Sequence, residues 1–242
     1  MLLSHLHKFI FIKSVKTAST SVELHLEHLC APPGHIIPPP TPMLETEFGI
    51  IGDRSGAAEK PRFYNHITPD LIRERVPAEV WERYVKVTTV RNPFDRIVSA
   101  FHFFVLWRAK RSVTTDEIPG LFREWLAGQS LGTLSMKRFI VLDGQPCIDI
   151  MIRYEDLSGT IEAFLDRIGA REKVQGPLPQ FKTHMRQVEL PLVAYYDQAS
   201  RDLVVQKAEL DFEQWGYSLC VADADVERAR VVLPDRTQPD TR

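Results

Sequence analysis

The chain has 242 residues, of which 44% are hydrophobic and 26% are charged, and its formal net charge is -2. This composition is typical of a globular protein with one sizeable core, and the balanced charge argues against a dedicated nucleic-acid binder. No apolar run is long enough for a membrane span, and the N-terminal segment lacks the features of a signal peptide, so we expect a cytoplasmic protein. Cys30, Cys147 and Cys220 are too scattered to indicate a disulfide framework or a metal site.

The first predicted strand, Phe9–Ile12, is a short run of aromatic and β-branched residues. It leads into Lys16 and the hydroxyl-rich residues 17–21, which open a helical pattern. Unpaired N–H groups at such a helix N-terminus bind anions, and the anion is often a phosphate. The alternative is a Ser/Thr helix cap beside a solvated lysine. The turn is not a Walker A loop, because no glycine in the chain precedes a lysine.

Two later segments also carry candidate residues or loops. Residues 31–42 are proline-rich, which favours an extended loop, either over the site or as a plain connection. Farther along, Thr68 and Pro69 predict a helix start, which places His66 at a strand-to-helix junction. A histidine there is either a general base, since imidazole can be neutral near pH 7, or a structural residue.

The second predicted strand, Val85–Val90, ends at Arg91 and is followed by a helix that carries Ser99. An arginine at a strand end suits a phosphate, and the alternative is a pair with a nearby carboxylate. A third strand, 148–154, is again followed by a helix. This alternation predicts an α/β fold with a central parallel sheet flanked by helices, and it places Lys16 and Arg91 at the ligand-binding edge.

Four segments together resemble the sulfotransferases that use 3′-phosphoadenosine 5′-phosphosulfate (PAPS), and most closely the carbohydrate O-sulfotransferase branch. They are the 5′-phosphosulfate loop at 15–21, the 3′-phosphate motif Arg-x-Pro-x-x-Arg-x-x-Ser at 91–99, the strand-end segment 153–157 and the closing segment 211–217. Val15 stands where that family usually has proline. The resemblance covers about residues 8–219 and implies a three-layer fold like that of the P-loop NTPases.

The resemblance also implies roles for individual residues. Lys16 would contact the bridging oxygen of the phosphosulfate, and His66 would be the general base, a role that other branches give to a glutamate. The predicted phosphate ligands are Thr17, Ala18, Ser19, Thr20 and Ser21 for the 5′-phosphate, and Arg91 and Ser99 for the 3′-phosphate. The loop around Lys182 to His184 would lie near the cofactor. No metal is expected, because a sulfuryl group carries less charge than a phosphoryl group and no ligand cluster is evident.

We expect a sulfotransferase-like domain at 1–219 and a partly disordered C-terminal tail at 220–242. The predicted function is transfer of a sulfuryl group from PAPS to a hydroxyl of a carbohydrate or another small alcohol. Two alternatives stay open, namely a nucleotide or small-molecule kinase on a related fold and a non-catalytic nucleotide-binding protein. The acceptor and the oligomeric state do not follow from the sequence.

Overall fold

The computed structural model describes residues 1–229, apart from 39, 57–58, 60, 111, 175, 180–187 and 189. Within these residues a six-stranded sheet in the order β3-β4-β1-β2-β5-β8 forms the centre of the fold. Its strands are β1 (Leu2–Ser4), β2 (Phe9–Ile12), β3 (Leu44–Thr46), β4 (Gly49–Ile51), β5 (Val85–Val90) and β8 (Ile150–Arg153). A separate ribbon pairs β6 (Val141–Leu142) with β7 (Gln145–Pro146).

The sheet is mixed, which corrects the expectation of a parallel sheet. Strands β2, β5 and β8 are parallel neighbours, as predicted. On the other side of β2, however, β1 pairs antiparallel with both β2 and β4, and β3 pairs antiparallel with β4. These three added strands have three residues each, which is too short to produce a recognisable alternation in the sequence.

Alternate residues of β2 pack on opposite faces of the sheet. Phe9 and Phe11 belong to a core cluster with α1 (Ser19–Leu26) and α8 (Leu157–Arg167). Ile10 and Ile12 belong to a second cluster that includes α2 (Pro69–Arg75) and α4 (Pro93–Phe101). Since strand side chains alternate between faces, helices on both faces explain why β2 reads as a continuous apolar run. The helix-flanked α/β class is therefore confirmed, whereas a specific likeness to P-loop NTPases stays a prediction.

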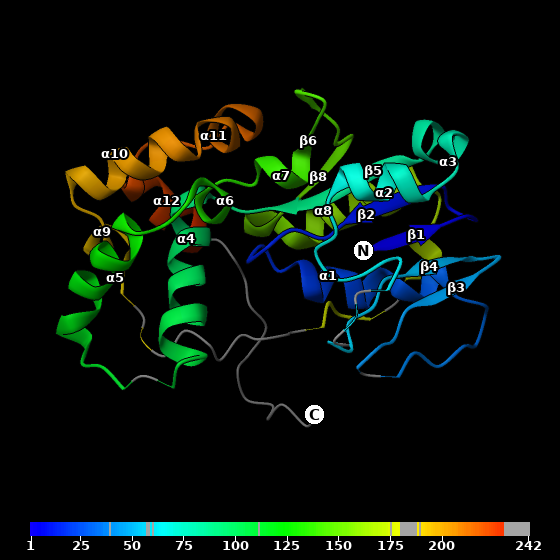
Figure 1. The fold of residues 1–242 in the computed structure, drawn as a ribbon, viewed down its shortest axis with the longest axis horizontal. Coiled ribbons are helices and arrows are strands. Elements are labelled where there is room, and N and C mark those ends of the chain that lie inside the picture. Colours follow the sequence, from blue (N-terminus) through cyan, green and yellow to red (C-terminus); the bar gives the residue numbers. More distant parts are fainter. Residues whose placement is uncertain are drawn as a thin grey trace.

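The remaining helices lie mainly beside the sheet, where Figure 1 shows α4, α5 and α9–α12 gathered together. Helix α4 continues into a π-helical turn, His102–Trp107, which we call the π-turn. The other helices are α3 (Ala78–Arg83), α5 (Ile118–Ala127), α6 (Leu131–Leu134), α7 (Lys137–Ile140), α9 (Leu192–Tyr195), α10 (Gln198–Lys207), α11 (Glu209–Trp215) and α12 (Val221–Ala229). Short 3-10 turns lie at Glu27–Cys30, Thr115–Glu117, Tyr154–Asp156 and Arg171–Lys173.

Helix α12 falls within the expected C-terminal tail. It packs against α4 and α9, and its residues Val221 and Ala224 are buried. The described part of that tail is therefore a packed helix, and 230–242 lie outside the described residues. The domain boundary at 219 stays a prediction.

The parallel strands bring three segments to one edge of the sheet. In the register, Ile12 of β2 lies opposite Thr88 of β5, and Val90 at the end of β5 lies opposite Arg153 of β8. The segments that follow these strands contain Lys16, Arg91 and Tyr154, respectively. Because the carboxyl ends of parallel strands form the ligand-binding edge of such a sheet, the candidate site is built from these three segments.

Candidate functional site

The turn after β2, residues 13–18, has a strained backbone. Lys16 and Ala18 adopt left-handed conformations, with φ of 62° and 60°. For a residue with a Cβ atom this conformation costs about 1–3 kcal/mol, so it persists only where the surrounding structure enforces it. The segment contains no glycine, and the sequence therefore gives no sign of this geometry.

A net of buried hydroxyl groups enforces the shape of the turn. Ser14 Oγ donates to the Thr89 carbonyl oxygen (2.7 Å) and lies 2.6 Å from Thr17 Oγ1, which lies 2.6 Å from Thr89 Oγ1. Ser19 Oγ donates to the Ser14 carbonyl oxygen (2.6 Å). The hydroxyls of Thr17 and Ser19 therefore stabilise the turn, and the contact of these two residues with a phosphate stays a prediction.

Helix α1 begins directly at this turn. Its N-cap is Ala18, whose methyl group cannot cap the helix, and its first residues are Ser19, Thr20 and Ser21. The first N–H groups of a helix lack partners within the helix, and the helix dipole attracts negative charge to them. Thr20 is half-buried and Ser21 is buried. This geometry fits the predicted 5′-phosphate segment, whose role stays a prediction.

Arg91 connects the segment after β5 with the turn after β2. Its Nη1 donates to the Lys16 carbonyl oxygen (3.3 Å), its Nε donates to Asp95 Oδ2 (2.7 Å), and its Nη2 lies 2.6 Å from the same oxygen. Its guanidinium also lies 3.8 Å from the centre of the Tyr154 ring. Arg91 thus pairs with a carboxylate, and these contacts engage three of the five N–H donors of a guanidinium. Ser99 is half-buried on α4, and its contact with a ligand stays a prediction.

The second arginine of the same motif, Arg96, points into the core. It is 2% exposed, donates to the carbonyl oxygens of Thr133 (3.3 Å) and Leu134, and pairs with Asp211 Oδ2 at 3.3 Å. Arg96 therefore joins α4 to α6 and α11 instead of facing the sheet edge. Asp211 belongs to the closing segment 211–217, so this contact holds the closing segment against α4.

Glu155, from the segment after β8, holds the residue that follows Arg91. Its Oε1 accepts the Asn92 N–H (2.7 Å), and its Oε2 accepts the Tyr217 hydroxyl (2.7 Å). The Asn92 side chain accepts the Phe94 N–H (3.1 Å) and donates to Glu227 Oε2 on α12 (2.9 Å). Burial raises the pKa of Glu155. The segment after β8 thus holds the Asn92 backbone beside the predicted 3′-phosphate site, and α12 holds the Asn92 side chain.

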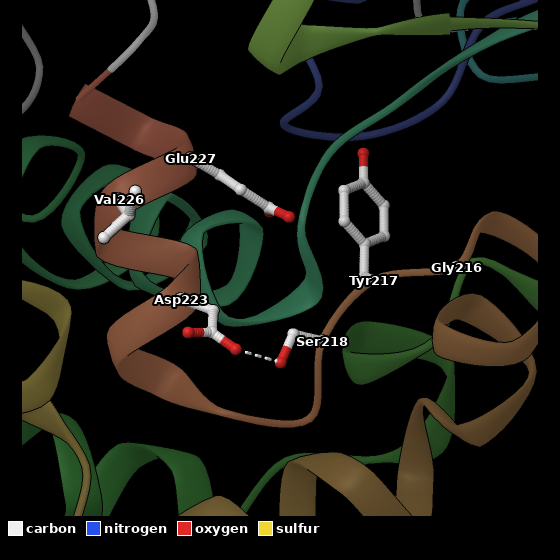
Figure 2. A pocket seen from close by; sticks show the side chains of 6 residues that line it. All are labelled: Gly216, Tyr217, Ser218, Asp223, Val226 and Glu227. Atoms are coloured by element: carbon white, nitrogen blue, oxygen red, sulfur yellow. Dashed lines mark hydrogen bonds between the residues drawn. The ribbon is translucent and has the colours of Figure 1, made fainter.

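An open pocket lies between α12 and the closing segment (Figure 2). Its volume is about 480 Å³, and its lining residues are Gly216, Tyr217, Ser218, Asp223, Val226 and Glu227. Figure 2 shows Tyr217 and Glu227 on opposite walls. Because the carboxylates of Asp223 and Glu227 would repel a phosphate, we do not place the phosphate groups of a nucleotide in this pocket.

His66, which shortly precedes α2, contacts the turn after β2. Its Nδ1 lies 3.1 Å from the Lys13 carbonyl oxygen, and its backbone is left-handed, with φ of 59°. A carbonyl oxygen only accepts hydrogen bonds, so Nδ1 carries the hydrogen and Nε2 carries the lone pair. Burial, reinforced by the charge of Lys13, lowers the pKa of His66 to about 4. The imidazole is therefore neutral at physiological pH, as a general base must be.

A comparison with known families identifies the family of the chain. A family model described as Sulfotransferase family matches residues 1–218. The chain belongs to the sulfotransferase family. No curated protein and no solved structure matches it. Membership confirms the family that the four segments indicated, and it identifies the protein as a transferase of sulfuryl groups.

The structure of this sulfotransferase brings together residues that the sequence placed far apart. Arg91 meets the Lys16 carbonyl, and His66 meets the Lys13 carbonyl three residues earlier. The predicted loop around Lys182 to His184 lies outside the described residues. Within the part of the chain that the structure describes, no group of three or more His, Cys, Asp or Glu residues could hold a metal ion, and no helix is long and apolar enough to cross a membrane.

A buried charge cluster beside the turn was missed by sequence reasoning. Glu23 on α1 is fully buried and accepts from the Met1 ammonium (3.0 Å) and from Lys13 Nζ (2.6 Å), with Arg54 Nη1 at 3.5 Å. Arg54 also pairs with Glu27. Burial alone would raise the pKa of Glu23, but the cations of Met1, Lys13 and Arg54 outweigh it and lower that pKa to about 2. Leu26, three residues later on the same helix face, was a weak signal that this face is covered.

Proposed function

We propose that this sulfotransferase transfers a sulfuryl group from PAPS to a hydroxyl of a carbohydrate or another small alcohol. The observation that carries the proposal is the convergence of Lys16, Arg91 and His66 on one turn. Arg91 contacts the Lys16 carbonyl (3.3 Å), and His66 contacts the Lys13 carbonyl (3.1 Å). A cation, an arginine at a strand end and a neutral imidazole are the groups that this reaction uses.

The donor set fits the charges of PAPS. The N-terminus of α1, with the backbone N–H groups of Ser19, Thr20 and Ser21, suits the 5′-phosphosulfate. The guanidinium of Arg91 is held in place by Asp95, which leaves donor capacity for the 3′-phosphate, and Ser99 is its proposed partner. PAPS supplies the sulfuryl group together with a stable leaving group, adenosine 3′,5′-bisphosphate.

The chain contributes a base and an electrostatic stabiliser. Nε2 of His66 accepts the proton of the acceptor hydroxyl while the oxygen of that hydroxyl forms its bond to sulfur. The bond between sulfur and the 5′-phosphate oxygen breaks at the same time, and its electron pair stays on the phosphate oxygen. The ammonium of Lys16 donates to this oxygen. Because the negative charge grows as the bond breaks, Lys16 stabilises the transition state more than the ground state.

The test compares Lys16→Ala with Lys8→Ala, which removes an exposed lysine that precedes β2. Transfer of labelled sulfate from PAPS is measured in EDTA, with methyl glycosides and simple alcohols as acceptors. We expect Lys16→Ala to lose roughly 10²–10³-fold in turnover and His66→Ala roughly 10²–10⁴-fold, while Lys8→Ala keeps wild-type turnover. Near-full turnover of Lys16→Ala, with bisphosphate binding intact, would contradict the role of Lys16.

Two other outcomes favour the alternatives. Magnesium-dependent phosphoryl transfer from ATP, with no sulfate transfer, would favour a kinase. Tight binding of adenosine 3′,5′-bisphosphate without turnover of any acceptor would favour a non-catalytic nucleotide-binding protein.

A further inference from the structure

The π-turn divides its side chains between the core and the surface. His102 and Leu106 are each 1% exposed, and His102 Nε2 lies 2.7 Å from the Tyr195 hydroxyl, so this side belongs to the core. Phe104 is 40% exposed and Trp107 is 38% exposed. Irregular π-helical turns occur frequently at functional sites, and this one continues the helix whose N-cap, Asn92, directly follows Arg91.

The half-buried ring of Phe103 connects the exposed rings of Phe104 and Trp107 with the candidate site. Phe103 and Trp107 are nearly parallel, with ring centres 5.4 Å apart and planes inclined by 15°. Phe104 packs edge-on against Phe103, with ring centres 4.9 Å apart. Lys16 Nζ lies 4.3 Å from the centre of the Phe103 ring. We call Phe103, Phe104 and Trp107 the aromatic platform, which extends from the Lys16 ammonium to the exposed side of Trp107.

The proposed reaction brings the acceptor next to this surface. In an in-line transfer the acceptor oxygen and the leaving oxygen flank the same sulfur atom, and Lys16 is the proposed partner of the leaving oxygen. The acceptor therefore binds within a few ångströms of the groups that surround Lys16 Nζ. Phe103 is one of these groups, at 4.3 Å.

We propose that the aromatic platform binds the ring that carries the acceptor hydroxyl, with Trp107 as its main stacking partner. Aromatic side chains bury large flat areas and prefer ring-shaped partners. The acceptor class that fits is a ring with an apolar face, which pyranosides and phenols share and linear alcohols lack. This inference rests on the proposed function, and it assigns acceptor specificity to residues outside the four segments that carry the family resemblance.

The experiment uses Trp107→Ala, with Trp107→Phe as a variant that keeps a ring. Leu6→Ala is the control, because Leu6 is 61% exposed and precedes β2, at the end of the strand remote from the turn. Three probes are methyl glucopyranoside, phenol and butan-1-ol. Calorimetry measures the binding of each probe to the full chain with adenosine 3′,5′-bisphosphate present, and sulfate transfer from PAPS gives each acceptor KM.

We expect wild type to prefer a ring probe over butan-1-ol, and the preferred ring probe distinguishes a sugar from a phenol. Trp107→Ala should weaken ring binding and raise the ring acceptor KM by about fivefold or more, with bisphosphate affinity unchanged. Trp107→Phe and Leu6→Ala should stay near wild type. If Trp107→Ala kept the ring affinity and KM of wild type, or if wild type preferred butan-1-ol, the aromatic platform would not bind the acceptor ring. The proposed sulfuryl transfer would still stand. Failure of wild type to use any probe or to bind the bisphosphate would overturn the proposed function and the platform with it.

Discussion

Replacing Arg91 with alanine removes a proposed phosphate ligand and also breaks a buried ion pair. Loss of a hydrogen bond to a charged group costs about 1.5–3 kcal/mol, which corresponds to about a 10- to 150-fold weaker affinity for adenosine 3′,5′-bisphosphate. The partner Asp95 is 1% exposed, and removing one member of a buried pair costs about 3–5 kcal/mol of unfolding free energy. Arg228 Nε lies 3.9 Å from the other Asp95 oxygen, so we expect the lower end of that range.

The double variant Arg91→Ala/Asp95→Ala separates the two effects. With both charges removed, no carboxylate is left buried without Arg91, so the unfolding free energy should recover in part relative to Arg91→Ala. Affinity for the bisphosphate should not recover, because the phosphate ligand is still missing. Urea denaturation and metal-free calorimetry measure these quantities. Wild-type affinity in Arg91→Ala, or restored affinity in the double variant, would refute the assignment of Arg91 to the phosphate.

Two further predictions concern the groups beside the turn. In the ligand-free protein, NMR titration of His66 should give a pKa of about 4, so the ring stays neutral from pH 8 to pH 5, whereas an ordinary value near 6.5 would contradict its burial. Because this pKa is lower in the folded state, His66 makes the unfolding free energy fall as the pH drops from 6.5 towards 4. Glu23→Gln should lower the unfolding free energy at pH 7 by about 3–5 kcal/mol, since buried cations lose their partner. The contribution of Glu23, whose folded pKa is about 2, is present above pH 4.5 and is lost as the pH falls through 2, so this variant should unfold less steeply with acid in urea titrations. If the unfolding free energy of Glu23→Gln fell as steeply with acid as that of wild type, Glu23 would not be the source of that fall.

The sequence predicted those parts of the fold that depend on local pattern. The strands Phe9–Ile12 and Val85–Val90 coincide with β2 and β5, because buried apolar runs between turns have few other solutions. Strand β1 was missed because its three residues owe their conformation to pairing with β2 and β4. Helices α9, α10 and α11 follow one another closely in the chain, and the break between α9 and α10 lies at Asp197, which caps α10.

The sequence predicted where the candidate site lies, but it did not predict how the side chains of the site are arranged. The alternation of strands and helices alone put Lys16 and Arg91 at one sheet edge, and the hydrogen bond from Arg91 to the Lys16 carbonyl oxygen shows that they meet. The hydroxyl of Thr17 points into the fold because it hydrogen-bonds with the hydroxyl of Thr89. Thr89 is distant in the chain, so no local sequence pattern could reveal this orientation. The burial of Glu23 likewise depends on Lys13 and Arg54, which fold onto α1 from two other segments.

The most direct test of the proposed PAPS site is calorimetry of the purified protein in EDTA with adenosine 3′,5′-bisphosphate and, separately, with adenosine 5′-monophosphate. We expect metal-free binding of the bisphosphate and about a 10-fold or greater loss of affinity when the 3′-phosphate is absent, since Arg91 loses its proposed partner. Equal affinity for the two nucleotides, or binding only of ATP with magnesium, would contradict the proposed site.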